Sequence, residues 1–322
     1  MVRDDEALHY GNLRDDPKRM SPRRFVMISI RSLWNGLKVV SLLLAFCALA
    51  GQAMQKTEAG KSSDTPVTLT YQFPEGKALA YRQSGTETQN LEMMGQSMTS
   101  QTQSSIEFTA KQKGLKDGQF TLGITINALK IDSSSPQGDV SADTSSVLSK
   151  SFDMILSRLG KEIDTSGAAA IKYEFGSTGT RDLSGRFQSF FPDLPDRPVK
   201  TGDTWPSEDA VTQKVGSGEL RITTKNVHTL DGFETVDGFE CARIKTAVKG
   251  TLTGNLEQGG VGLSLDCTME GSETWYFAIK EGMLIKSDSK GSIGGNLALG
   301  DPVNSTIPIG GETHEETRLI QK

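Results

Sequence analysis

Three consecutive stretches between residues 77 and 131 alternate apolar and polar side chains, with glycines between them. A period of two residues is typical of β-strands that bury one face. Gly95-Gln96 favours a two-residue hairpin turn, because glycine tolerates the positive φ that such a turn requires. With residues 114–118 as the second loop, the sequence predicts a three-stranded antiparallel meander. In this register Met93 lies opposite Met98, and the apolar side chains share one face.

Polar residues interrupt the middle of that apolar face. They are Glu87, Gln89, Thr102 and Ser104. Two interpretations stay open: the ribbon extends beyond the core at this level, or its inner face borders a wet cavity.

The remaining sequence predicts more long strands and one helix. Strands are expected near residues 217–230, 238–253, 262–279 and 283–298, between turn signals such as Asp237-Gly238. A helix is predicted over residues 145–159, since apolar residues recur there at three-to-five spacing and Gly160 follows. The predicted fold class is therefore mainly β (α+β): long antiparallel, curved β-sheets with one main helix packed on a face, half-barrel-like.

The predicted organisation has two β units. Residues 67–190 form the first unit, with the helix at 145–159, and residues 207–322 form the second. The connector, residues 191–206, carries four prolines after an aromatic cluster. Residues 51–66 are small and polar and are interpreted as a flexible tether.

The N-terminal region has the pattern of an export signal. An apolar run at residues 39–50 follows basic residues, and Ala48-Leu49-Ala50 suits cleavage after Ala50. Acidic residues near the beginning are atypical of a signal, so we expect the true start at Met20 or Met27. The predicted location is extracytoplasmic, either periplasmic or secreted. The alternative is an uncleaved N-terminal membrane anchor.

The charge of the chain argues against one class of partner, and its cysteines allow a disulfide. Residues 1–50 carry 8 of the 35 Lys and Arg but only 5 of the 40 Asp and Glu, so the remaining chain is acidic. An acidic protein repels nucleic acid.

Cys241 and Cys267 form a disulfide candidate if their hairpin turns at Gly254-Asn255. A turn at Gly259-Gly260 places them too far apart.

Catalytic and metal motifs are not recognisable in the sequence. His228 and His314 follow the signal region without ligand spacing, so each is interpreted as a solvated or strand-surface histidine, and no metal or cofactor is predicted. Soft thioether sulfurs can bind cuprous ion, and three methionines lie close together at Met93, Met94 and Met98. The predicted register argues against a copper site, because it turns Met94 to the opposite face. A cross-strand apolar pair of Met93 and Met98 is favoured.

Several segments resemble a known family. They are "LEMMGQSMTSQTQSSIEFT", "FPDLPDRPVKTGDTWP" and "DGFECARIKT", followed by a Trp-aromatic strand and "EGML". Together they are similar to an uncharacterised exported bacterial protein family, a domain of unknown function (DUF6263-like), over about residues 66–300. The resemblance implies an exported β-rich protein and assigns no activity or catalytic residue.

Three functions are considered. The first is a non-enzymatic extracytoplasmic protein that binds a lipid or another apolar small molecule. The second is an envelope interaction or scaffold protein with a filled core, and the third is a carboxylate-dependent hydrolase. The ligand-binding candidates are Met93, Met98, Leu91, Tyr81, Ile106, Phe108 and Phe152.

Overall fold

The chain folds into one 14-stranded sheet whose pairings are antiparallel. The computed structural model describes residues 65–93, 96–176, 179–215, 218–258 and 260–321. The strands are β1 (Ala78–Met93), β2 (Gln96–Lys116), β3 (Gln119–Ser134), β4 (Val140–Asp143), β5 (Ser151–Ser157), β6 (Glu162–Asp164), β7 (Lys172–Phe175), β8 (Thr180–Asp182), β9 (Thr204–Val215), β10 (Gly218–Val236), β11 (Phe239–Gln258), β12 (Val261–Ala278), β13 (Met283–Leu299) and β14 (Ser305–Gln321). The helical turns named among the described residues are η1 (Ser145–Val147), η2 (Ser166–Ala170) and α2 (Ser184–Phe187).

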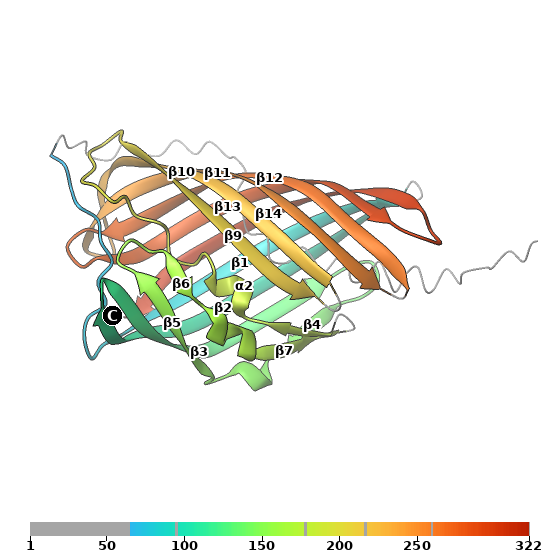
Figure 1. Cartoon of the computed structure of the whole chain (residues 1–322), viewed down its shortest axis with the longest axis horizontal. Coiled ribbons are helices and arrows are strands. Elements are labelled where there is room, and N and C mark those ends of the chain that lie inside the picture. Colours follow the sequence, from blue (N-terminus) through green and yellow to red (C-terminus); the bar gives the residue numbers. More distant parts are fainter. Residues whose placement is uncertain (1–64, 94–95, 177–178, 216–217, 259, 322) are drawn as a thin grey trace, which may run out of the picture.

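The sheet curls into a half-barrel (Figure 1). Its strand order is β8-β7-β4-β3-β2-β1-β14-β13-β12-β11-β10-β9, with β5 and β6 added beside β3. Strands from both predicted β units lie in this sheet, because β1 pairs with β14. The prediction of a mainly antiparallel β protein is confirmed. Among the described residues, no helix has the length and apolar character needed to cross a membrane.

The prediction of one main helix at residues 145–159 is wrong. Only Ser145–Val147 is helical, as a single 3₁₀ turn, and Ser151–Ser157 is strand β5. Phe152, Met154 and Leu156 alternate inward along β5, which pairs with β3 and β6. The apolar residues of 152–159 include one set with helical spacing and one with strand alternation, so the local pattern is ambiguous. Residues 151–157 form a strand because they pair with the edge of β3.

The predicted meander is present, but its register is shifted by two residues. Leu91 lies opposite Met98 and Tyr81 opposite Phe108, while Met93 pairs with Gln96. The connecting residues 94–95 lie outside the described part of the chain. A two-residue shift leaves every side chain on its predicted face.

The second hairpin is tighter than predicted. Asp117 and Gly118 have φ of 51° and 76°, so a two-residue turn replaces the expected loop at residues 114–118. Phe108 consequently pairs with Ile126 rather than Ile124, with irregularities in the register on both sides of this level.

Cys241 and Cys267, the cysteines of the described part of the chain, are free and buried. The ladder of β11 and β12 continues to the pair of Gln258 with Val261, which excludes a hairpin turn at Gly254-Asn255. Cys241 therefore lies opposite Ala278, and Cys267 lies opposite Leu252. Of the two alternatives drawn from the sequence, the structure shows the one that keeps the thiols apart.

The concave face of the sheet is divided into three zones. A large apolar cluster fills one end and includes Tyr81, Phe108 and Trp275. A smaller distal apolar cluster fills the other end and includes Leu91, Met98 and Leu252. The strands from β2 through β1 and β14 to β9 carry polar side chains between these clusters, and we call this zone the polar belt. Its members are Gln83, Glu87, Gln89, Ser100, Thr102, Ser104, Ser207, Asp209, Gln213, Thr224, Asn226, His228, Thr246, Glu273, Ser287, Ser289, Thr313, Glu315 and Thr317.

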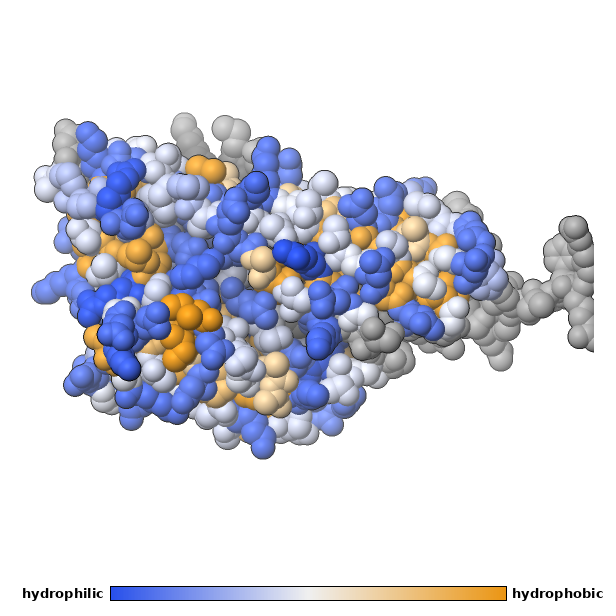
Figure 2. Space-filling view, viewed as in Figure 1, coloured by the Kyte–Doolittle hydropathy of each residue, from blue (hydrophilic) through white to orange (hydrophobic). Residues whose placement is uncertain are grey.

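The outer surface is mixed. On the face shown in Figure 2, hydrophilic side chains separate small apolar patches. The exposed large apolar residues of the described chain are Leu115, Leu148, Ile163, Val227 and Ile320. Isolated apolar side chains of this kind are normal on a protein surface.

Gly160 is expected to be a sensitive backbone position. Its φ is 95°, and a Cβ built there would lie 2.4 Å from the Pro192 carbonyl oxygen and 2.7 Å from Tyr71. Gly160→Ala should therefore lower the free energy of unfolding by about 2 kcal/mol or more. Gly118→Ala is the control, because Gly118 also has a positive φ of 76° but no atom within 4 Å of a built Cβ. Urea unfolding of the two variants measures the difference, and equal losses would contradict the steric argument.

Candidate functional site

A cavity of about 180 Å³ lies inside the curled sheet at the level of the polar belt. Strands β1, β2 and β9–β14 supply most of its wall. Residues 185–193 close it on the side where the edge strand β9 approaches the first half of the chain. The interruption of the apolar face of the meander therefore marks a wet cavity, because Glu87, Thr102 and Ser104 line it.

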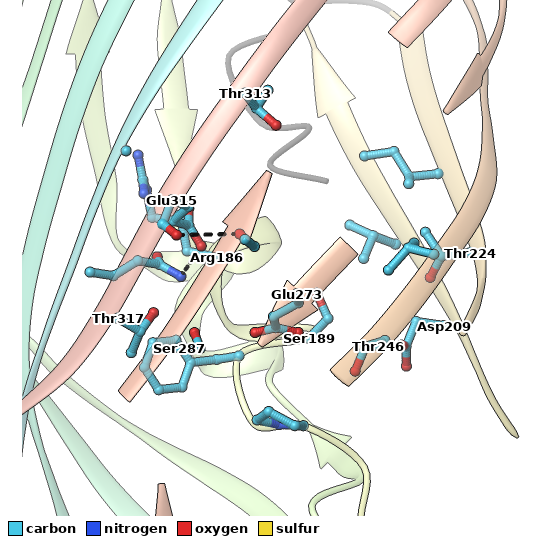
Figure 3. Close-up of a pocket in the computed structure, with 18 of the residues that line it drawn as sticks. Arg186, Ser189, Asp209, Thr224, Thr246, Glu273, Ser287, Thr313, Glu315 and Thr317 are labelled. Atoms are coloured by element: carbon cyan, nitrogen blue, oxygen red, sulfur yellow. Dashed lines mark hydrogen bonds between the residues drawn. The ribbon is translucent and has the colours of Figure 1, made fainter. Parts of the chain in front are cut away.

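Two carboxyl groups of the cavity wall, those of Glu273 and Glu315, are drawn in Figure 3. Glu273 comes from β12 and Glu315 from β14. Gln83 Nε2 donates a hydrogen bond of 2.6 Å to Glu315 Oε1, and Arg186 lies beside this carboxyl group. Burial raises the pKa of Glu273 and of Glu315 to about 7, and the Glu273 charge adds to the shift of Glu315. Both groups can thus exchange protons near neutral pH.

A third carboxyl group, Glu87, lies deeper in the wall. Its side chain is 9% exposed, and Gln89 Nε2 donates a hydrogen bond of 2.7 Å to its Oε1. Burial raises the pKa of Glu87 to about 8, although the hydrogen bond from Gln89 and the charge of Arg181 act in the opposite direction. Desolvation therefore outweighs both favourable contacts.

Hydroxyl groups line the cavity wall between the carboxyl groups. The hydroxyl-bearing residues that line the cavity include Thr102, Ser104, Ser189, Ser207, Thr224, Thr246, Ser287, Ser289, Thr313 and Thr317. Each hydroxyl can donate one hydrogen bond and accept two. The wall thus suits a molecule that both donates and accepts hydrogen bonds.

His228 belongs to a hydrogen-bond chain at one side of the cavity. Trp275 Nε1 donates to Thr246 Oγ1 at 2.9 Å, and Thr246 Oγ1 lies 2.8 Å from His228 Nδ1. His228 Nε2 lies 2.9 Å from Ser207 Oγ, and the Ser207 hydroxyl is hydrogen-bonded to Asp193. The chain links β12, β11, β10 and β9 to the segment that closes the cavity.

The imidazole of His228 is neutral at pH 7, because burial lowers its pKa to about 4. The neighbouring Ser207 Oγ accepts a hydrogen bond of 3.1 Å from Asn226 Nδ2. An imidazole with a pKa this low is a weak general base, which argues against activation of Ser207 as a nucleophile.

The closing segment, residues 184–193, is held by aromatic packing. Phe108 lies 5.0 Å from Phe187 and 4.8 Å from Phe190 between ring centroids, both edge-on. Trp205 Nε1 donates a hydrogen bond of 2.9 Å to the Asp193 carbonyl oxygen. Edge-to-face ring pairs and a buried hydrogen bond fix this segment over the cavity.

Lys161 joins the closing segment to the edge strand. Its Nζ lies 2.8 Å from Asp209 Oδ1 and 3.7 Å from Asp193 Oδ2. Burial raises the pKa of Asp193 to about 6, and Lys161 opposes that shift. The ammonium group therefore balances two carboxyl groups at the seam between β9 and residues 184–193.

The sequence-predicted ligand residues lie apart from this cavity. Tyr81, Ile106, Phe108 and Phe152 are buried in the large apolar cluster, and Leu91 and Met98 are buried in the distal apolar cluster. None of these six side chains lines the cavity. Met93 pairs with Gln96 at the end of β1.

Sequence reasoning missed most of the site. It named Glu87, Thr102 and Ser104 as an anomaly but assigned no role to Glu273, Glu315 or Asn226. His228 is 3% exposed, so its interpretation as a surface histidine is wrong, whereas His314 is exposed and bonded to Asp288. The available signal was polar residues at inward positions of β10–β14. Within the described residues, no group of three or more His, Cys, Asp or Glu could hold a metal ion.

Stability is expected to fall as the pH rises from about 5 to 8. Burial raises the pKa of Glu87 and Glu162 to about 8 and of Glu273 and Glu315 to about 7. Between the unfolded pKa near 4.5 and these folded values, the native state binds more protons than the unfolded state. The free energy of unfolding therefore decreases with pH in this window.

Glu87→Gln tests the sign of this effect. The variant should gain on the order of 1–3 kcal/mol relative to wild type at pH 8 and much less at pH 5.5. Urea unfolding at both pH values measures it, with Glu92→Gln, an exposed position on the same strand, as control. An equal effect of Glu87→Gln at both pH values would contradict a raised pKa.

The fold and cavity define a mainly β protein with a hydrophilic interior site. No family model matches the chain, and no curated protein matches it. Among solved structures, DynF from the dynemicin biosynthesis pathway of Micromonospora chersina is similar at 8% identity and a TM-score of 0.24, covering 85% of this chain and 96% of that one. An outer membrane channel from Pseudomonas putida F1 is similar at 10% identity and a TM-score of 0.24, covering 83% and 99%.

A third similar structure is a DUF1329 family protein from Desulfovibrio piger, at 12% identity and a TM-score of 0.15, covering 76% of this chain and 87% of that one. TM-scores this low carry no argument about fold or function. The family resemblance drawn from the sequence motifs stays a prediction.

Proposed function

We propose that this chain is an exported, non-enzymatic binding protein that encloses a small hydrophilic molecule in the belt cavity. The observation that carries the proposal is the polar belt itself. Each strand from β2 to β9 around the sheet places polar side chains inward at the same level. Inward polar groups forgo apolar burial, and they are stable only when hydrogen-bonded to protein, water or ligand.

The cavity favours a hydrophilic ligand over a lipid. Most of its lining residues carry carboxyl, amide or hydroxyl groups, and apolar surface is added by Phe190, Phe191, Pro192, Val211, Ile222 and Val248. An acyl chain placed there would displace water from these groups without replacing its hydrogen bonds. The apolar side chains expected to bind a lipid pack against one another in the two clusters. A volume of about 180 Å³ exceeds the roughly 150 Å³ of an engineered cavity that binds benzene, so a small solute fits.

Export and the absence of catalysis are parts of the proposal. The signal-like pattern at residues 1–50 lies outside the described residues, and the sequence alone supports it. The low pKa of His228, which makes it a weak general base, supports binding rather than catalysis by a serine nucleophile. A carboxylate-dependent hydrolase and a scaffold without ligand are the competing functions.

Analysis of the solutes released from the purified full chain tests the proposal. Protein from its own host would be purified without added small molecules and denatured, and the aqueous and organic phases would be examined by mass spectrometry. Thr313→Phe fills the cavity from β14, and Glu312→Phe places the same ring on the exposed face of that strand.

We expect a water-soluble compound near one equivalent from wild type and Glu312→Phe, and its loss from Thr313→Phe. A lipid in the organic phase would overturn the proposal in favour of the apolar carrier. The absence of any solute from all three proteins would favour the scaffold.

A further inference from the structure

One buried hydrogen-bond acceptor of the cavity wall has no donor. Asn226 lines the cavity and is 9% exposed. Its Nδ2 donates to Ser207 at 3.1 Å and to Asp209 at 3.0 Å, whereas its Oδ1 has no hydrogen-bond partner. Native structures rarely leave a buried amide oxygen without a donor. A ligand that brings N–H or O–H groups would supply one.

The charges of the lining residues are also unbalanced. Glu87, Asp193, Asp209, Glu273 and Glu315 line the cavity, and Arg186 is the one arginine or lysine among the described lining residues. Arg186 acts on Glu315, and Arg181 acts on Glu87. Lys161 balances Asp193 and Asp209 at the seam. Among the described lining carboxyl groups, Glu273 is left without a cationic neighbour that acts on it.

Glu273 shows the imbalance most clearly. Its hydrogen-bond partner is Ser287, and the charged neighbour that acts on it, Asp288, is also acidic. Glu273 pairs with Ser289 across β12 and β13, and Ser289 pairs with Glu315 across β13 and β14, so the two glutamates lie at one level on either side of Ser289. A positive charge between two such carboxyl groups would be attracted by both, in surroundings where screening by water is weak.

Resting on the proposed function, we propose that the ligand is a small cationic amine, bound through its ammonium group between Glu273 and Glu315. An ammonium group has three donors and no acceptor, which complements carboxylates and the free Asn226 oxygen. Hydroxyl groups elsewhere on the ligand would bond to the Ser and Thr side chains of the belt. An aminated polyol or a short diamine has this combination of groups.

Binding of such a cation should release protons. Glu273 and Glu315 have pKa values of about 7, so each is partly protonated at neutral pH. An adjacent ammonium group favours the ionised carboxylates and lowers these pKa values. The heat of binding at pH 7 will therefore depend on the ionisation enthalpy of the buffer. A neutral ligand gives no such release through this contact.

Isothermal titration of the full chain tests the inference with two matched pairs of probes. Glucosamine is compared with glucose, and putrescine with 1,4-butanediol. In each pair the first compound has amino groups where the second has hydroxyl groups. Any ligand carried through purification is removed by unfolding and refolding. Glu273→Gln and Glu315→Gln remove one charge each at nearly constant shape, and Glu312→Gln, exposed on β14, is the control.

We expect at least one amine to bind more than tenfold more tightly than its hydroxyl partner, with proton release. Each Gln variant at Glu273 or Glu315 should weaken that amine about tenfold or more, and Glu312→Gln should not. Binding of a hydroxyl compound with equal or higher affinity would overturn the cation while leaving the proposed function intact. If no probe binds, and wild type releases no solute that Thr313→Phe lacks, both proposals fail.

Discussion

Phe108→Ala is expected to lower the free energy of unfolding by about 3–5 kcal/mol without changing the affinity of the folded protein for its ligand. Phe108 is fully buried, and its ring contacts Tyr81, Phe187 and Phe190 at centroid distances of 5.7, 5.0 and 4.8 Å. Truncation removes the transfer free energy of the ring and leaves a cavity between β2 and the closing segment.

Urea unfolding measures the stability loss, and Leu115→Ala is the matched control. Leu115 lies on the same strand and is 43% exposed, so its truncation should cost about 0.5 kcal/mol or less. Affinity is measured where both proteins are folded. A loss of affinity with little loss of stability would show that Phe108 belongs to a ligand site, as the sequence suggested.

Thr246→Val is expected to destabilise the protein by about 2–4 kcal/mol. Thr246 is 3% exposed, and its hydroxyl joins Trp275 Nε1 to His228 Nδ1. Valine has a similar shape but no hydroxyl, so the indole N–H and the imidazole nitrogen lose their partners inside the protein. Each unsatisfied buried group costs roughly 1–3 kcal/mol.

Two further variants separate the hydroxyl from the packing. Thr246→Ser keeps the oxygen and should recover most of the stability, at a cost of about 1 kcal/mol for the lost methyl group. Thr251→Val, exposed on the same strand, should change stability by less than about 0.5 kcal/mol. Chemical denaturation with tryptophan fluorescence follows all three. A Val variant as stable as the Ser variant would contradict the hydrogen-bond chain.

Alternation along the chain predicted the sheet, because a one-sided strand buries every second residue. The strands expected around residues 217–298 correspond to β10–β13. The register of the first hairpin was wrong by two residues, since Gly95-Gln96 and residues 94–95 are both acceptable turns. A register error of two residues leaves each side chain on the same face of the sheet. The apolar face was therefore predicted correctly although the pairing was not.

The helix prediction failed because the apolar residues of 152–159 include one set with helical spacing and another with strand alternation. Phe152, Ile155 and Leu159 suit a helix, whereas Phe152, Met154 and Leu156 suit a strand. The edge of β3 was available for pairing with residues 151–157, and that long-range contact is invisible in a local pattern.

Strands β9 and β14 were missed for a reason that bears on function. The inward residues of β14 include Gly311, Thr313, Glu315 and Thr317, and those of β9 include Ser207 and Asp209. A strand whose inner face borders a wet cavity lacks the apolar alternation by which strands are recognised. The polar inward residues of β9 and β14 both line the cavity and remove the apolar alternation that would have identified these strands.

The candidate site could be predicted only in outline. Glu87, Thr102 and Ser104 indicated a wet surface on the first hairpin. Glu273, Glu315 and Asn226 come from strands far away in the sequence, and only the pairing of β1 with β14 brings the two halves around one space. No local pattern records that pairing.

A crystal structure of the full chain, purified from its own host without added small molecules, tests the central claim most directly. The account predicts ordered density for a small hydrophilic molecule in the belt cavity, within hydrogen-bond distance of Glu273 and Glu315. An acyl chain there, or a cavity that contains only water, would contradict it.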